Sequence, residues 1–201
     1  MFKKILHRIV ANPWVYDRIQ VFFGARQNQQ RVAQHISAVT PASLILDLGG
    51  GTGIFREIWP STCTYICLDN DIVKLRGFLN KYTDGTALLA DATRIPIRSN
   101  SVDFVLCTSM SHHVHEDVLA HLIQEGIRVL KGTGKFIFMD GVLRPESWKN
   151  RFLWKLDRGL FPHTEEVLRS LISSHFQIIH WEKFSIYLDC IFAIGIKYHK
   201  D

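Results

Sequence analysis

The sequence predicts an α/β fold with one mostly parallel sheet, because short apolar runs alternate with helix-like stretches along the chain. Five of these runs have the length and continuous apolar character of strands that are buried on both faces. They span residues 43–48, 64–69, 86–90, 102–107 and 134–140. Two later runs, 177–184 and 188–197, are joined by a tight connection and indicate an antiparallel C-terminal hairpin. We therefore expect a doubly wound, seven-stranded sheet.

The stretches between the strands carry helix signals. Residues 71–80 follow Asn70, a residue type that caps helix N-termini. Residues 115–131 have apolar side chains at helical spacing, and this helix is expected to end at Lys131-Gly132. Further helices are expected at 14–38, 53–59 and 164–174.

Three regions divide the chain. Residues 1–40 are expected to form a helical cap, and residues 41–201 are expected to form the main domain. Within it, residues 141–162 are an irregular basic and aromatic stretch, which we interpret as an insertion on the substrate side.

Composition limits the function classes. Of 201 residues, 47% are hydrophobic and 21% are charged, which is the balance of an ordinary globular domain. The formal net charge of +5 is spread along the chain, so no nucleic acid partner is expected. The sequence carries no signal for oligomeric state. Four cysteines lack zinc-site spacing and favour small buried thiols in a reducing, cytoplasmic compartment: Cys63, Cys67, Cys107 and Cys190.

No apolar run reaches the length of about 18 residues that a membrane span needs. Residues 1–10 are basic, and their apolar side chains share one helical face. Two interpretations stay open for them: peripheral contact with a membrane surface, or packing on the domain.

The stretch LILDLGGGTG at 44–53 places four glycines after a strand that contains Asp47. A P-loop is excluded, because no Lys-Ser or Lys-Thr follows. A dinucleotide turn lacks its third glycine, and Asp47 would face an anionic pyrophosphate. The register is D-x-G-x-G-x-G, formed by Asp47, Gly49, Gly51 and Gly53. A carboxylate beside a bare backbone suits a ligand with an amino group or a sulfonium.

This register resembles the first motif of class I S-adenosylmethionine-dependent methyltransferases, which have a Rossmann-like fold. The resemblance implies that the glycines approach the methionine moiety and that Asp47 lies near its ammonium group. It also implies that Asp69 and its neighbour Asn70 bind the ribose at the tip of the second strand. In ADATRIPI, Asp91 and Ala92 match the residues beside the adenine.

The resemblance continues along the chain. SVDFV at 101–105 looks like the fourth strand of that family, and IRVLKGTGKFIF at 127–138 looks like its turn into strand five. Overall it covers residues 42–140, with a weaker continuation to 197. It is closest to the small-molecule enzymes of quinone biosynthesis, with a type 11 methyltransferase domain.

The loop CTSMSHHVHED follows the fourth strand, where the family resemblance implies contacts to both methyl donor and acceptor. Ser109 and Met110 are the expected cofactor contacts, whereas His112 and His113 are candidate catalytic residues, since histidine can act as a base near neutral pH. Alternatively, either histidine could have no catalytic role and simply belong to the turn that precedes the next helix. The spacing of the HHVH stretch does not fit a metal site, and none is expected.

Aromatic side chains are concentrated in the two segments expected to cover the acceptor. Aromatic side chains that line a pocket suit a flat or lipidic substrate. Packing of a lid on the core would explain the same residues. They are Trp14, Tyr16, Phe22, Phe23, Trp148, Phe152, Trp154 and Phe161. TSMS at 108–111 replaces the [DNS]-P-P-[FYW] pattern of nucleic-acid amino-methyltransferases, which argues against adenine or cytosine amino groups as acceptors.

The sequence therefore predicts an S-adenosylmethionine-dependent methyltransferase with a small, hydrophobic or aromatic organic acceptor. Three alternatives remain: a non-catalytic binding or accessory protein with the same fold, an NAD-dependent oxidoreductase, and a methyltransferase with a macromolecular acceptor.

Overall fold

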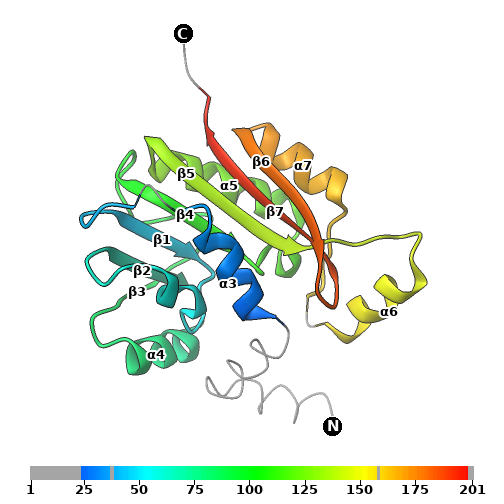
Figure 1. Ribbon diagram of the computed structural model, residues 1–201, viewed down its shortest axis with the longest axis horizontal. Coiled ribbons are helices and arrows are strands. Elements are labelled where there is room, and N and C mark those ends of the chain that lie inside the picture. Colours follow the sequence, from blue (N-terminus) through cyan, green and yellow to red (C-terminus); the bar gives the residue numbers. More distant parts are fainter. Residues whose placement is uncertain (1–23, 37–38, 158, 199–201) are drawn as a thin grey trace. The chain divides into compact units, whose positions relative to one another are not determined.

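The computed structural model describes residues 24–36, 39–157 and 159–198 (Figure 1). The expectations for residues 1–23, including membrane-surface contact by residues 1–10, lie outside these ranges. The chain divides into two compact units, the first ending at Asp91 and the second beginning at Ala92. None of the described helices has the length and apolar character needed to cross a membrane.

Seven strands form a mixed sheet in the order β3-β2-β1-β4-β5-β7-β6, which confirms the predicted Rossmann-like α/β fold. The first five strands overlap the apolar runs that predicted them, although β5 begins at Leu130 and not at residue 134. Strand β7 is the antiparallel strand between β5 and β6. Their bounds are β1 Leu44–Leu48, β2 Thr64–Asp69, β3 Thr86–Leu89, β4 Val102–Thr108, β5 Leu130–Gly141, β6 Phe176–Ser185 and β7 Asp189–Lys197.

The first unit contains the parallel strands β1, β2 and β3. Its helical elements are α3 (Ala25–Ala33), the 3₁₀ turn η1 (Ile54–Ile58) and α4 (Ile72–Lys81). Helix α4 packs against β2 and β3 with the fully buried Phe78. Asn70 was expected to cap this helix, but that was wrong: Asp71 Oδ1 accepts from the Val73 N–H at 2.8 Å. A carboxylate one residue later has the reach to that N–H, and Asn70 is left exposed.

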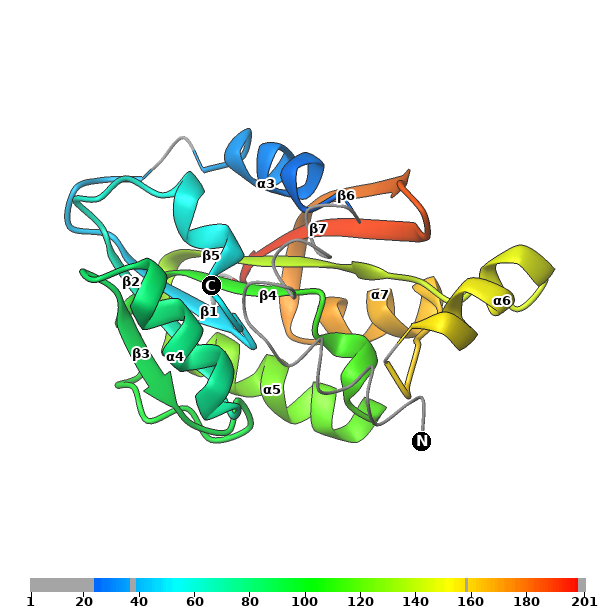
Figure 2. The same ribbon diagram turned by 90° about the horizontal axis from the view of Figure 1, so that it is seen from below.

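The second unit holds β4 and β5 in parallel, with β7 and β6 continuing antiparallel. Its helices are η2 (Ser111–His113), α5 (Glu116–Val129), α6 (Trp148–Leu156) and α7 (Glu165–Ser173). Helices α5 and α7 pack against each other and against the strands of this unit (Figure 2). Helix α6 stands away from those strands in both ribbon views.

Two sequence-based expectations for this unit were wrong. Helix α5 ends at Val129 and not at Lys131-Gly132, because Leu130 already pairs with Val102 as the first residue of β5. The stretch 141–162 is not irregular throughout, since it contains α6. Ser147 begins that helix, with its Oγ accepting from the Asn150 N–H at 3.3 Å.

Candidate functional site

The loop after β1 depends on glycine for its backbone shape. Gly49, Gly51 and Gly53 have φ values of 66°, 58° and 73°, which lie in the left-handed region that favours glycine. At Gly50, an added Cβ would lie 2.7 Å from Asp47 Oδ2 and 2.8 Å from Cys67 Sγ. The loop therefore leaves its backbone bare directly beside the Asp47 carboxylate.

Asp47 is a buried carboxylate with an incomplete set of hydrogen-bond partners. Its exposed fraction is 1%, and the Tyr65 hydroxyl donates to Oδ2. Oδ1 has no hydrogen-bond partner among the described residues. Burial raises the pKa of Asp47 to about 7; the Tyr65 hydrogen bond lowers this pKa, and the nearby Asp69 raises it further. A cation placed at Oδ1 would reverse much of this penalty.

Asp69, at the end of β2, joins the glycine loop to the next helix. Its Oδ2 accepts from the Gly51 N–H at 3.0 Å, and its Oδ1 accepts from the Asp71 N–H at 2.8 Å. Lys74 Nζ lies 3.9 Å from Oδ2. A carboxylate oxygen accepts more than one hydrogen bond, so both oxygens retain acceptor capacity. The structure thus brings the predicted Asp47, Gly51 and Asp69 together within the first unit.

The remaining predicted cofactor residues are divided in sequence between the two units, which meet at Asp91 and Ala92. Asn70 is exposed beside Asp69, and Asp91 is exposed as the last residue of the first unit. Ala92 is buried as the first residue of the second unit. Ser109 is exposed where β4 ends, with a φ of 51° that is unusual for a non-glycine residue, and its N–H donates to Met139 O at 2.8 Å. Met110, next to it, is half-buried.

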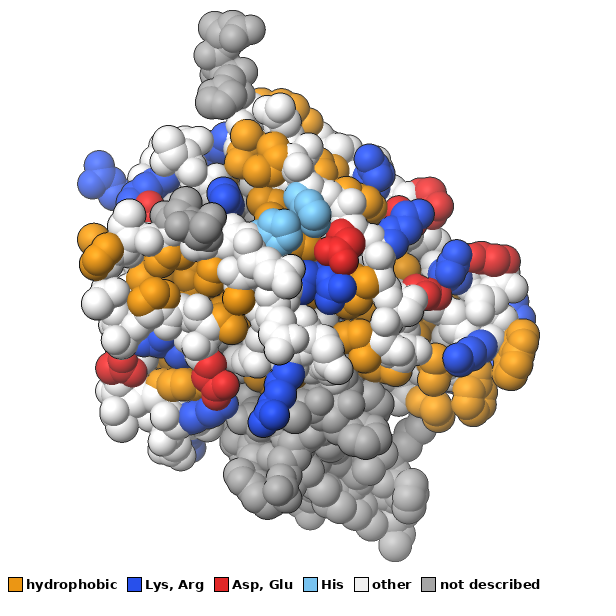
Figure 3. All heavy atoms as spheres, in the orientation of Figure 1, with side chains coloured by type: hydrophobic (Ala, Val, Ile, Leu, Met, Phe, Trp, Pro, Cys, Tyr) orange, Lys and Arg blue, Asp and Glu red, His pale blue; other side chains and the backbone are white. Residues whose placement is uncertain are grey.

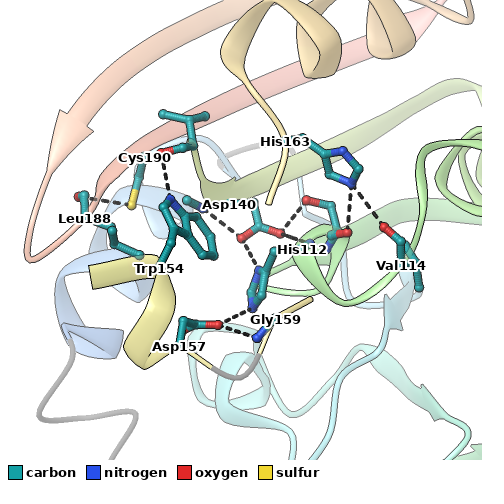
Figure 4. A network of polar contacts seen from close by, with 12 residues as sticks. His112, Val114, Asp140, Trp154, Asp157, Gly159, His163, Leu188 and Cys190 are labelled. Atoms are coloured by element: carbon teal, nitrogen blue, oxygen red, sulfur yellow. Dashed lines mark hydrogen bonds and ion pairs between the residues drawn. The ribbon is translucent and has the colours of Figure 1, made fainter. Parts of the chain in front are cut away.

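His112 is held by a carboxylate that the sequence analysis did not select (Figure 4). Its Nδ1 lies 2.6 Å from Oδ1 of Asp140, at the end of β5. Asp140 Oδ2 accepts from the Ser111 N–H at 2.7 Å and from the Ser111 hydroxyl at 2.5 Å. Oδ1 also accepts from the Gly141 N–H at 2.7 Å. This network fixes the loop after β4 against the end of β5.

A second carboxylate faces the other side of the imidazole. Asp157 Oδ1 lies 3.7 Å from His112 Nε2, and the same oxygen accepts from the Gly159 N–H at 2.7 Å (Figure 4). Burial lowers the pKa of His112, but Asp140 and Asp157 outweigh burial and raise this pKa above its ordinary value. Burial works against the Asp140 charge, yet His112 and the Ser111 and Gly141 donors hold the pKa of Asp140 at about 2. The two groups therefore favour each other's charged forms, an imidazolium beside a carboxylate.

The other two histidines of interest differ in their surroundings. His113 is exposed, with its ring centre 4.2 Å from that of His112. His163 is buried, and its Nε2 lies 3.2 Å from Ser111 O and 3.1 Å from Val114 O. His163 therefore supports the loop after β4 from the side opposite Asp140, as Figure 4 shows.

A hollow of about 310 Å³ also lies in the second unit, among the ends of β5, β6 and β7 and the start of α7. Its charged side chains pair with one another: Lys183 with Glu165 at 2.7 Å and Arg144 with Asp189 at 3.3 Å. Glu146 and Glu166 also line the hollow, and we assign it no binding role.

Comparison with known proteins identifies the family. Residues 46–138 match the family described as a methyltransferase domain. A tRNA (carboxymethyluridine(34)-5-O)-methyltransferase of Schizosaccharomyces pombe is 26% identical over 141 residues, covering 69% of this chain and 60% of that protein. A human protein named probable tRNA methyltransferase 9B is 26% identical over 173 residues, covering 81% of this chain and 35% of that protein. The matched part of the chain thus spans 60% of the length of the first relative and 35% of the second.

A solved structure supports the fold. Geranyl diphosphate methyltransferase in complex with S-adenosylmethionine has a TM-score of 0.72 and 10% identity, covering 86% of this chain and 85% of that chain. The domain match places residues 46–138 in the methyltransferase domain family, and the solved structure shows that the chain has the fold of class I S-adenosylmethionine-dependent methyltransferases. The match to a methyltransferase domain is evidence against the NAD-dependent alternative.

A methyltransferase domain implies use of S-adenosylmethionine, and the residues of the first unit fit this group. The buried Asp47 Oδ1 lacks a partner, as expected of an oxygen that receives an ammonium group. The glycine loop can run directly beside this carboxylate because Gly50 has no side chain, since a Cβ there would collide with Asp47.

Proposed function

We propose that this methyltransferase acts on a small, hydrophobic or aromatic organic acceptor. The observation that carries the proposal is the apolar edge of the loop after β4. The Trp154 ring centre lies 5.5 Å from that of His112, and the Phe161 ring packs edge-on against His115 at 5.6 Å. Phe161 N–H also donates to His112 O at 3.0 Å. Phe161 is 39% exposed at this loop, and an aromatic surface of this kind suits an apolar acceptor better than a charged one.

The cofactor contacts follow from the chemistry of each donor and acceptor. Asp47 Oδ1 would accept from the ammonium group, the Gly49–Gly53 backbone would lie along the methionine moiety, and Asp69 with Asn70 would accept from the ribose hydroxyls. Asp91 and Ala92 are assigned to the adenine, and Ser109 and Met110 to the region of the methyl group. When bound, S-adenosylmethionine supplies an electrophilic methyl group on a sulfonium. The chain then has to align the acceptor and exclude water.

The two candidate catalytic histidines receive different roles. His112 lies between two carboxylates that favour its protonated form, and we assign it the positioning of the loop. His113 is exposed one residue later. It is the better candidate to take a proton when the acceptor has to lose one.

A tRNA acceptor is the second candidate, because the curated relatives are named as tRNA methyltransferases. For localisation we propose the cytoplasm, since the four cysteines are thiols and thiols persist in reducing compartments.

Transfer of a labelled methyl group separates the two acceptors. The protein is incubated with labelled S-adenosylmethionine and either a cellular organic extract or total tRNA. Label in the organic fraction supports the proposal, whereas label in tRNA replaces it with the second candidate. His113→Gln should slow transfer to the true acceptor about 100-fold if His113 is the base. His121→Gln, on an exposed side chain of α5 whose Nδ1 lies 2.9 Å from Asp117 O, is the matched control and should leave the rate unchanged.

A further inference from the structure

Helix α6 exposes a line of large apolar side chains. Trp148, Phe152 and Leu156 are 75%, 54% and 68% exposed. They are spaced four residues apart, so they form a stripe about 80° wide along the helix. The following segment continues the apolar surface, with Leu160 80% exposed and Phe161 39% exposed. Single exposed apolar residues are common, but three along one side of a helix, with two more in the segment that follows, mark an interaction surface.

The opposite side of α6 is fixed to its own unit. Asn150 and Trp154 are 3% and 6% exposed. Asn150 Nδ2 and Trp154 Nε1 both donate to Val142 O at 3.1 Å. Asn150 Oδ1 in turn accepts from the Arg144 N–H at 2.9 Å. The apolar stripe is therefore held outward by specific hydrogen bonds, and little ordering would be needed when a partner binds.

Cations border the stripe on both sides. Lys149 lies about 60° from its centre in one direction, and Lys155 and Arg151 lie about 60° and 100° away in the other. Helix α6 contains no acidic residue, and none of these three cations forms an ion pair among the described residues. Figure 3 shows hydrophobic and basic side chains gathered together over α6.

We propose that α6 and residues 159–161 form a docking surface for an anionic lipid bilayer. Apolar side chains would enter the boundary between headgroups and acyl chains, while the bordering cations would contact lipid phosphates. Charge complementarity selects this partner, since a second copy of the chain would bring like charges together across a two-fold contact. Single-stranded RNA would stack on aromatic rings, but Leu156 and Leu160 offer no ring to stack on.

This docking surface does not depend on which acceptor is methylated. It would, however, give the enzyme direct access to an acceptor dissolved in the membrane. Its test therefore measures lipid binding and cofactor binding separately from methyl transfer.

The experiment is flotation of the full chain with vesicles of phosphatidylcholine, with and without phosphatidylglycerol. We expect the protein to float with the anionic vesicles only. Trp148→Ser with Phe152→Ser should weaken vesicle binding at least about tenfold, because two apolar anchors are removed. Lys155→Gln should weaken it about fivefold.

Matched controls come from exposed residues elsewhere in the same unit. Ile179→Ser changes a side chain that is 49% exposed on β6, and Arg98→Gln removes an exposed cation. Neither should alter flotation, and all variants should bind S-adenosylmethionine like the wild type in calorimetry. Absence of flotation, or equal flotation of the α6 variants, would overturn the proposal. So would loss of tRNA binding by the α6 variants in a gel shift without any vesicle binding, which would make α6 an RNA interface.

Discussion

Asp47 and Asp140 are both buried carboxylates near the carboxyl end of a parallel strand, yet their acidities are opposite. The pKa of Asp47 is raised to about 7, whereas that of Asp140 is lowered to about 2. Their exposed fractions are 1% and 3%, so burial alone does not distinguish them. The two pKa values differ because the neighbours supply different numbers of hydrogen-bond donors and different charges to each carboxylate.

Asp140 accepts from a backbone N–H and a hydroxyl of Ser111, from Gly141 N–H and from the His112 ring. Asp47 accepts from the Tyr65 hydroxyl and has a second oxygen without a hydrogen-bond partner among the described residues. Donors and an opposite charge favour the ionised form, and burial without them opposes it. A carboxylate with a complete set of partners stabilises the fold, and an incomplete one fits a ligand.

The largest effect on stability is expected when the hydrogen-bond network around Asp140 is broken. Asp140→Asn should lower the free energy of unfolding by about 3–5 kcal/mol, because it leaves buried donors and His112 without their carboxylate. Chemical denaturation measures this loss. Asp103→Asn removes a less buried partner of Lys131 and should cost less than about 1 kcal/mol. Equal losses for the two variants would contradict the importance we give to the Asp140 network.

The next effect tests the cofactor site of the first unit. Asp69→Ala should weaken S-adenosylmethionine binding roughly tenfold to a few hundredfold, since two ribose hydrogen bonds to a carboxylate are lost. Calorimetric titration gives the affinity. Asp84→Ala, at a 60% exposed side chain paired with Arg56, serves as control and should bind normally. An unchanged affinity in Asp69→Ala would remove this residue from the site.

A third experiment uses the raised pKa of Asp47. In the free protein this carboxyl is mostly protonated below pH 7, but an ammonium ligand requires the charged form. Binding should therefore release a proton, and affinity should fall up to about tenfold per pH unit as the pH drops below about 7. Titrations between about pH 6 and about pH 7.5 would show this slope. Asp47→Asn should bind weakly with no such slope, and a slope that persists in this variant would assign the proton to another group.

The smallest effect sharpens the contrast between the two carboxylates. Because the folded-state pKa of Asp47 lies above its unfolded value, the ionised carboxylate opposes folding as the pH rises from about 4 towards about 7. Asp47→Asn should therefore increase the free energy of unfolding of the free protein at pH 8 by about 1–2 kcal/mol. This gain should be seen as a higher melting temperature. At pH 4 the gain should disappear. A lower melting temperature at both pH values would show that Asp47 has a purely structural role.

The first unit could be predicted well because its signals are local. The run TYICLD at 64–69 coincides with β2, since a strand buried on both faces is continuously apolar. Asp47 lies one residue before the end of β1, and Asp69 is the last residue of β2. Parallel strands then bring Asp47 and Asp69 to the same edge without any further information.

The second unit was harder to predict because its key contacts are distant in sequence. Asp140 is the partner of His112 across 28 positions, and the strand GKFIFMD gives no sign that its last residue will receive an imidazole. The only available signal was an acidic residue at a strand end, the same feature that selected Asp69. Helix α6 was missed because its apolar stripe faces outward, so its pattern does not match that of a helix packing on a core.

The position of β7 has a consequence for protein synthesis. Strand β6 pairs with β7 and not with β5, although it is made before β7. As the chain leaves the ribosome, β1, β2 and β3 can pair soon after they emerge. Strand β6 has to wait until residues 189–197 are available to bridge it to β5. Until then the edge of β5 is open, and the nascent second unit is the part of the chain most exposed to misassembly.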